Sequence, residues 1–289
     1  MFTPPCGVYQ WSRRRNAGPD TSESGANAPM KVVILCGGQG TRIRGIADDL
    51  PKPMIPIGDL PILWHLMKSY ARAGHRDFIL CLGYKARVIK EFFLNYEAHT
   101  TDFTITLGRD KAIEYHGNRD QADWRVTLAD TGLDTMTGAR VKRIEEYVAG
   151  EENFMLTYGD GLGDIDFDAL VAFHRGHGKI LTVTGVRPPG RFGELDGDAS
   201  GKVFEFNEKP QATGGRISGG FFVCRGELFD YLDDREDLVL EQEPLRGLVR
   251  DGQMMLYRHD GFWQCMDTYR DFALLNGLWT QGEAPWHST

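Results

Sequence analysis

A glycine-rich segment with two nearby cations is the first candidate for chemistry in this sequence. It reads Gly37-Gly38-Gln39-Gly40-Thr41-Arg42, and Lys52 follows in Pro51-Lys52-Pro53-Met54. Glycines let backbone N–H groups approach a phosphate closely, and the guanidinium of Arg42 and the ammonium of Lys52 supply local positive charge. The segment is therefore predicted to bind the phosphates of a ligand.

Two common phosphate-binding patterns do not fit this segment. A dinucleotide fingerprint requires a third glycine where this chain has Ile43. A Walker A loop requires a lysine directly after its second glycine, and Ile46 follows Gly45 instead. What remains is a Gly-Gly-x-Gly-Thr-Arg loop with a Lys-Pro pair further on. Taken alone, this loop is equally compatible with an ordinary strand-to-helix turn that carries incidental basic residues.

The elements around the loop predict a parallel, doubly wound α/β sheet. Residues 31–36 form a short apolar run, typical of a buried parallel strand, that ends in the glycine loop. A helix is expected from about Pro61 to a glycine cap at Gly74. A strand over 78–82 and an amphipathic helix over 86–96 follow. Such alternation of strands and helices indicates a parallel sheet.

The second half of the chain continues this pattern and then becomes richer in short strands. The first strand of this half, over 153–157, runs into Tyr158-Gly159-Asp160-Gly161. Further expected elements are helices over 166–177 and 269–279, strands over 180–186, 203–207, 217–224 and 254–257, and short helical pieces over 228–232 and 245–249. Residues 30–289 are predicted to form one domain. Met1–Pro29, rich in Gly, Pro, Ser, Asn and Arg, is predicted to be a disordered N-terminal extension.

Composition excludes several classes of function. The 289 residues carry a net charge of −8, so a general nucleic-acid binder is not expected. No apolar run approaches the about 20 residues of a membrane span, and no signal peptide is recognisable. The five cysteines are scattered and form no CxxC pair. A cytoplasmic protein with reduced thiols, no disulfide framework and no zinc site is therefore expected.

The glycine segment together with Pro51-Lys52-Pro53-Met54 resembles the signature of the sugar-phosphate nucleotidylyltransferases. Within that family the chain is most similar to the glucose-1-phosphate cytidylyltransferases, and the resemblance runs in order from about Lys31 to Trp286. The motifs that carry it are Pro61-Ile62-Leu63-Trp64-His65, Gly83-Tyr84-Lys85, Thr157-Tyr158-Gly159-Asp160-Gly161, Pro189-Gly190-Arg191-Phe192-Gly193, Glu208-Lys209-Pro210, Gly219-Gly220-Phe221-Phe222-Val223 and Met266-Asp267-Thr268.

The resemblance implies a Rossmann-like nucleotide-diphospho-sugar transferase fold with a smaller, β-rich sugar side. It also implies transfer of a cytidylyl group from CTP to α-D-glucose 1-phosphate, a first step toward CDP-linked deoxysugars. The sugar-phosphate oxygen is already an anion, so catalysis should rest on positioning, protein cations and Mg²⁺. The family pattern places the metal on Asp160 and Asp267, whose carboxylates are hard ligands. A homo-oligomer is also implied.

The remaining roles are likewise carried over from the resemblance. Arg42 and Lys52 match the positions that hold the triphosphate, Arg42 near the transferring phosphate and Lys52 on the pyrophosphate side. Residues that match the nucleotide-binding loop and the base region are Gly37, Gly38, Gly40, Thr41 and Gly138. Residues that match the sugar-phosphate site are Gly193, Glu208, Lys209, Ser218 and Gly219.

Departures from the family pattern leave alternatives open. Ser218 stands where the family commonly has Asn, beside the sugar, and Cys265 stands where a Pro is usual, beside Asp267. The same chemistry with another nucleoside triphosphate or sugar 1-phosphate therefore remains an alternative. So does a catalytically silent homologue that binds a nucleotide sugar. A glycosyltransferase is disfavoured, because Asp164-Ile165-Asp166 lies beyond the turn where its metal-binding triplet would be expected.

Overall fold

The computed structural model describes residues 28–38, 50–107, 112–116, 123–188, 194–197, 202–207 and 215–288. Nearly all of the expected N-terminal extension, up to residue 27, lies outside these described residues. Within the described ranges, no helix has the length and apolar character needed to cross a membrane.

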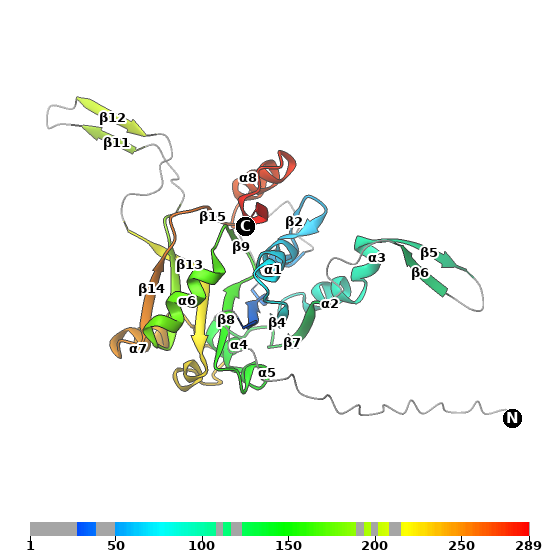
Figure 1. Ribbon diagram of the computed structural model, residues 1–289, viewed down its shortest axis with the longest axis horizontal. Helices are drawn as coiled ribbons and strands as arrows, with labels where there is room; N and C mark the ends of the chain where they lie inside the picture. Colours follow the sequence, from blue (N-terminus) through cyan, green and yellow to red (C-terminus); the bar gives the residue numbers. More distant parts are fainter. Residues whose placement is uncertain are drawn as a thin grey trace.

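A seven-stranded sheet forms the centre of the molecule, in the order β14-β10-β13-β8-β1-β4-β7 (Figure 1). Strand β1 pairs in parallel with β4 on one side and with β8 on the other. Strand β13 is antiparallel to both of its neighbours, β8 and β10. The expected mostly parallel, doubly wound sheet is therefore confirmed, with β13 as the exception. The strands are β1 (Lys31–Leu35), β4 (Asp77–Leu82), β7 (Arg125–Asp130), β8 (Asn153–Tyr158), β10 (Leu181–Val186), β13 (Ile217–Arg225) and β14 (Met254–Arg258).

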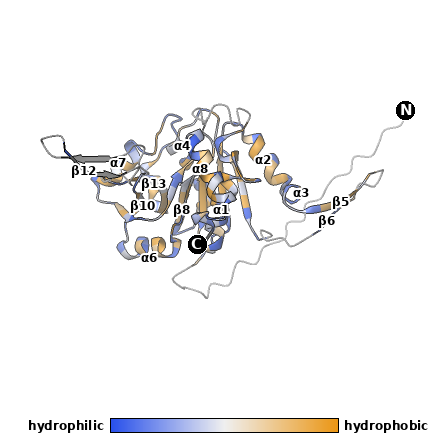
Figure 2. Ribbon diagram, turned by 90° about the horizontal axis from the view of Figure 1, so that it is seen from above, coloured by the Kyte–Doolittle hydropathy of each residue, from blue (hydrophilic) through white to orange (hydrophobic). Residues whose placement is uncertain are grey.

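Helices cover both faces of this sheet, and the side chains of the strands alternate between them. In β1, Val32 and Ile34 join one apolar cluster, while Val33 and Leu35 join the other. This alternation is the period-two pattern of a strand buried on both faces. Figure 2 shows apolar strands in the middle, with α1 and α6 on one side and α4 and α7 on the other. The helices are α1 (Ile62–Arg72), α4 (Thr137–Lys142), α5 (Glu145–Val148), α6 (Phe167–His177), α7 (Glu243–Arg250), α8 (Tyr269–Thr280) and α9 (Pro285–Ser288).

Two hairpins project from the body on opposite sides (Figure 1). One pairs β5 (Asp102–Thr106) with β6 (Ala112–His116), and the other pairs β11 (Glu194–Gly197) with β12 (Val203–Asn207). The first hairpin was not anticipated from the sequence. The helix expected over 86–96 is also interrupted at Asn95 and forms α2 (Ala86–Leu94) and α3 (Tyr96–Thr100).

Other boundaries differ in ways that have a local cause. Asp166 precedes α6 rather than belonging to it, because its carboxylate accepts a hydrogen bond from the backbone N–H of Ala169 at 2.9 Å and caps the helix. The piece expected over 228–232 is a 3₁₀ helix, η2 (Gly226–Tyr231), rather than an α-helix. None of these differences alters the order of the strands around the site.

Candidate active site

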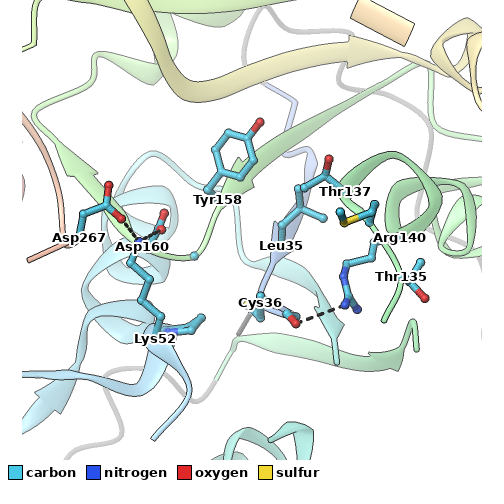
Figure 3. A pocket seen from close by; sticks show the side chains of 14 residues that line it. Leu35, Cys36, Lys52, Thr135, Thr137, Arg140, Tyr158, Asp160 and Asp267 are labelled. Atoms are coloured by element: carbon cyan, nitrogen blue, oxygen red, sulfur yellow. Dashed lines mark hydrogen bonds and ion pairs between the residues drawn. The ribbon is translucent and has the colours of Figure 1, made fainter. Parts of the chain in front are cut away.

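A cavity of about 360 Å³ opens beyond the carboxyl ends of β1 and β8. The chain leaves β1 toward β4 on one side, while β8 lies on the other, so this edge is the point where the strand order reverses. Open α/β sheets bind ligands in the crevice at such a point. The cavity is lined by Leu35, Cys36, Gly37, Gly38, Lys52, Pro53, Thr135, Met136, Thr137, Arg140, Tyr158, Gly159, Asp160 and Asp267 (Figure 3).

A short pair of antiparallel strands brings Asp160 and Asp267 together. Strand β9 (Gly161–Gly163) begins directly after Asp160, and β15 (Trp263–Cys265) ends two residues before Asp267. The register pairs Cys265 with Gly161, and the N–H of Met266 donates to the carbonyl of Asp160 at 2.8 Å. A Cβ at Gly163 would lie 3.0 Å from the carbonyl oxygen of Phe262, so a glycine suits this close pairing. The two carboxylates are therefore close together in space although they are far apart in the sequence.

Both carboxylates contact the ammonium of Lys52, which the 3₁₀ helix η1 (Lys52–Met54) presents to the cavity (Figure 3). The distance from Nζ to Oδ2 of Asp160 is 2.5 Å, and Oδ1 of Asp267 pairs with the same nitrogen. Burial lowers the pKa of Lys52, but the two carboxylates outweigh that effect and raise it above its ordinary value. Lys52 is therefore a permanent cation in the crevice.

Asp271 positions the loop that carries Asp267. Its Oδ2 accepts from the backbone N–H groups of Asp267 at 3.0 Å and Thr268 at 2.8 Å. Its Oδ1 accepts from the side-chain amide of Gln264 at 2.9 Å. Thr268 and Asp271 form a capping box at the start of α8. Asp271 was not predicted from the sequence, although the Thr-x-x-Asp spacing ahead of an expected helix is a local signal for a helix cap.

Arg140 organises the opposite end of the cavity. Its guanidinium donates to the carbonyl oxygens of Leu82, Gly132, Leu133 and Gly37 and to the hydroxyl of Thr131, over distances of 2.7–3.2 Å. It thereby joins the loops that follow β1, β4 and β7. Arg140 is only 4 % exposed, and burial lowers its pKa from the ordinary value of an arginine. Sequence analysis missed it, because no local pattern marks an arginine whose partners come from three loops.

Of the predicted nucleotide-binding glycines that the structure describes, two line the cavity and one lies behind its wall. Gly37 and Gly38 line the cavity, and Gly37 packs so tightly on the Arg140 guanidinium that a Cβ would collide with it. Gly138 is buried, and its N–H donates to the carbonyl of Leu238 at 2.9 Å. Its neighbour Thr137 supplies the side chain that lines the cavity at this point.

Ser218 and Gly219 lie on β13, close to the cavity but not in its wall. Ser218 is exposed, and the carbonyl of Gly219 accepts a hydrogen bond from Nε1 of Trp263 at 2.8 Å. Trp263 belongs to β15, so the strand that places Asp267 also fixes the position of Gly219.

The remaining predicted site residues lie outside the described residues, namely Gly40, Thr41, Arg42, Gly193, Glu208 and Lys209. Their roles stay predictions. Of the predicted catalytic residues, the structure brings together Lys52, Asp160 and Asp267.

Comparisons with known proteins agree with this arrangement. Residues 31–273 match the nucleotidyl transferase family model. A glucose-1-phosphate cytidylyltransferase of Salmonella typhi is 50 % identical over 257 residues, which are 89 % of this chain and 98 % of the relative. A probable glucose-1-phosphate cytidylyltransferase of Bacillus subtilis is 42 % identical and covers 89 % of this chain and 99 % of its own.

A solved structure supports the fold independently. The crystal structure of HddC from Yersinia pseudotuberculosis superimposes with a TM-score of 0.61 at 22 % identity, covering 86 % of this chain and 99 % of that one. The matched range of the family model contains β1, β8, β15 and the three converging side chains. From sequence identity, coverage and fold together, the chain belongs to the nucleotidyl transferase family and, within it, to the glucose-1-phosphate cytidylyltransferases.

Proposed function

We propose that this enzyme transfers the cytidylyl group of CTP to α-D-glucose 1-phosphate, giving CDP-glucose and pyrophosphate. The observation that carries the proposal is the convergence of Lys52, Asp160 and Asp267 at the switch point of the sheet, beside the loop that begins at Gly37. The identity of 50 % to a glucose-1-phosphate cytidylyltransferase supports the choice of nucleotide and sugar.

The reaction needs no general base from the protein. A phosphate oxygen of glucose 1-phosphate attacks the α-phosphorus of CTP, and the bond from that phosphorus to the oxygen bridging to the β-phosphate breaks. The electron pair of this bond leaves with pyrophosphate. Because both substrates are anions, the protein must hold them in line and offset their charge. Lys52 supplies a fixed cation for this purpose, and Arg42 is predicted to supply a second one.

The two carboxylates fit a divalent cation such as Mg²⁺. Lys52, Asp160 and Asp267 together carry one net negative charge, which opposes the approach of phosphates unless another cation is present. Among the described residues no cluster of three or more His, Cys, Asp or Glu side chains could hold a metal. At phosphate-transfer sites Mg²⁺ is commonly bound by one or two carboxylates, together with phosphate oxygens of the substrate and water molecules. Bound there, the ion would neutralise charge on the phosphates.

The nucleotide and the sugar are assigned to different sides of the cavity. The glycine loop after β1 and the Thr135–Thr137 segment form a wall that suits the nucleotide. Glu208 and Lys209 are predicted to hold the sugar hydroxyls and the sugar phosphate, with Gly193, Ser218 and Gly219 beside them. Lys209 would provide the cation that the sugar phosphate requires.

A homo-oligomer is proposed as the functional state. The β5–β6 hairpin exposes apolar side chains, with Phe103 41 %, Ile105 40 % and Ile113 51 % accessible to solvent. Contiguous apolar surface on a projecting element commonly marks a contact with another protein. Light scattering of the purified protein would give the mass, and a monomer would contradict this part of the proposal.

The function is tested by pyrophosphate release with Mg²⁺, using four nucleoside triphosphates crossed with a panel of sugar 1-phosphates. Turnover confined to CTP with glucose 1-phosphate is expected. Turnover with a different pair would support the proposed reaction type but would change the assigned nucleotide or sugar. The reverse reaction separates the remaining classes, since only a nucleotidylyltransferase returns CTP from CDP-glucose and pyrophosphate. Folded protein without turnover in either direction would contradict the proposal.

A further inference from the structure

The segment between η2 and α7 packs over the beginning of α4, which forms one wall of the cavity. The carbonyls of Glu236 and Leu238 accept from the N–H groups of Met136 at 2.7 Å and Gly138 at 2.9 Å. Helix α4 has no side-chain cap of its own, so these bonds satisfy its first donors. The cavity wall around Thr137 therefore depends on a segment about one hundred residues further along the chain.

Glu241 lies at the end of this segment and contacts two different parts of the wall. Its Oε2 accepts from the hydroxyl of Thr137 at 2.8 Å, and its Oε1 accepts from the hydroxyl of Tyr158. The same segment holds Thr137 a second time, because its hydroxyl oxygen accepts from the N–H of Leu240 at 2.9 Å. Thr137 and Tyr158 line the cavity, whereas Glu241 does not.

Tyr158 is held both by packing and by Glu241. It ends β8, two residues before Asp160, and its ring packs directly on the backbone of Gly220, where a Cβ would collide with it. The ring meets Phe222 edge-on, with centroids 6.0 Å apart. The hydroxyl of Tyr158, at the outer end of the ring, donates its hydrogen bond to the carboxylate of Glu241. Packing fixes the ring laterally, and Glu241 fixes its outer end.

We propose that Glu241 is a positioning residue for the nucleotide, which acts by holding Thr137 and Tyr158 in the wall of the cavity. In Figure 3 Thr137 lies away from the Lys52–Asp160–Asp267 cluster, on the side of Thr135 and Arg140, and Tyr158 lies between the two groups. The phosphates react at the cluster, so the far end of the cavity accommodates the base and the ribose. This inference rests on the proposed function, because it assumes that the cavity binds a nucleoside triphosphate.

The position of Glu241 leads to a selective kinetic effect. Loss of its carboxylate releases two hydrogen bonds that orient the nucleotide end of the cavity and leaves the reacting groups in place. E241A is therefore expected to raise the KM for CTP on the order of tenfold, the effect of losing hydrogen bonds to a charged group. The kcat and the KM for glucose 1-phosphate should each change by less than about threefold. A defect confined to one substrate separates positioning from general destabilisation.

Three further variants sharpen the test. E241Q retains an acceptor for one hydroxyl and a donor for the other, so it should restore the KM for CTP to within about threefold of the parent. Glu243 provides the matched control, since it is exposed, lies two residues further on and pairs only weakly with Arg235, at 3.5 Å. E243A should leave all three kinetic constants unchanged. Y158F combined with E241A should show less than additive loss, because both changes remove the same hydrogen bond.

Calorimetric binding of the four nucleoside triphosphates distinguishes failure of this inference from failure of the proposed function. Weaker CTP binding by E241A than by the parent and by E243A would support the positioning role. Equal CTP binding by parent, E241A and E243A would overturn it and leave the proposed function intact. A kcat loss at unchanged KM, or no rescue by E241Q, would also overturn it. A folded parent that binds no nucleoside triphosphate would overturn both.

Discussion

The ammonium of Lys52 lies 2.5 Å from Oδ2 of Asp160, although 108 residues separate the two in sequence. This ion pair sits in the cavity at the carboxyl end of β8, the kind of sheet edge at which open α/β folds bind ligands. Asp267 contacts the same ammonium from the other side. One cation thus keeps two like charges close together before any substrate arrives.

The carboxylate pair gives the first prediction. Asp267→Asn should lower turnover by at least about 100-fold, because it removes half of the charge available to a divalent cation. The fold should remain intact, since the backbone of this loop is held by Asp271 rather than by the Asp267 side chain. Pyrophosphate release over a Mg²⁺ titration measures the loss. Asp251→Asn, at an exposed aspartate bonded to Tyr231, is the control. A near-normal rate for Asp267→Asn would show that the metal assignment is wrong.

The hydrogen bond from Trp263 to Gly219 gives the second prediction. Trp263→Phe keeps an aromatic ring in β15 but removes the 2.8 Å bond from Nε1. Because Gly219 belongs to the predicted sugar-phosphate site, the KM for glucose 1-phosphate should rise several-fold, while the KM for CTP changes little. Steady-state kinetics with each substrate varied in turn measures this difference. A larger rise in the KM for CTP would place β13 on the nucleotide side instead.

Two helical glycines are expected to respond in opposite directions to alanine. In α4, a Cβ at Gly138 would lie 2.9 Å from the carbonyl oxygen of Leu238, so Gly138→Ala should destabilise the protein by about 1–3 kcal/mol. In α6, a Cβ at Gly176 meets nothing within 4 Å, so Gly176→Ala should stabilise it by about 0.5–1 kcal/mol. Denaturant unfolding measures both changes. Equal changes in the free energy of unfolding for the two variants would mean that Leu238 moves aside without any loss of stability.

Buried histidines should make stability depend on pH. Burial lowers the pKa of His65, His75 and His174 to about 4, below the ordinary value of 6.5. Their neutral forms are therefore favoured in the folded state. The stability they contribute is complete above about pH 6.5 and is lost as the pH falls toward 4, because the unfolded chain then binds more protons. The unfolding midpoint should fall across this window.

His174 allows the source of that pH dependence to be checked. Its ring nitrogens lie 2.8 Å from Oγ1 of Thr182 and 3.1 Å from Oδ1 of Asn153, so a neutral ring satisfies both contacts. His174→Gln should weaken the pH dependence, whereas the same change at exposed His99 should not. Thermal unfolding at intervals between pH 4 and 7 measures this. An unchanged slope in His174→Gln would exclude His174 as a contributor.

The sequence predicted the inner strands of the central sheet well, because they are buried on both faces, whereas the largely exposed edge strand β7 was not predicted. Continuous apolar runs such as Val32–Leu35 have few other interpretations when glycines follow them. Strands β9 and β15 contain three residues each, too few for any periodicity to show. They nevertheless determine how Asp160 and Asp267 meet. The fold was therefore predictable from local patterns, while the geometry of the site was not.

In the candidate site, too, residues within local sequence motifs were predicted, whereas residues that act through partners distant in sequence were not. Lys52, Asp160 and Asp267 were identified from motifs around each residue. Arg140, Asp271 and Glu241 were missed, because each acts through partners that local spacing does not bring into view. Asp271 was the most accessible of the three, since its capping box with Thr268 is a local pattern. The importance of Glu241 depends on Tyr158, which precedes it by 83 residues.

The pairing of β9 with β15 also governs when the reaction centre can exist during synthesis. Translation produces Lys52 and Asp160 well before Asp267. Trp286, close to the carboxyl end, is buried in the same apolar cluster as α1. A nascent or prematurely terminated chain that stops before β15 thus has most of its sheet residues and one carboxylate. Such a chain lacks Asp267, and we expect it to be inactive.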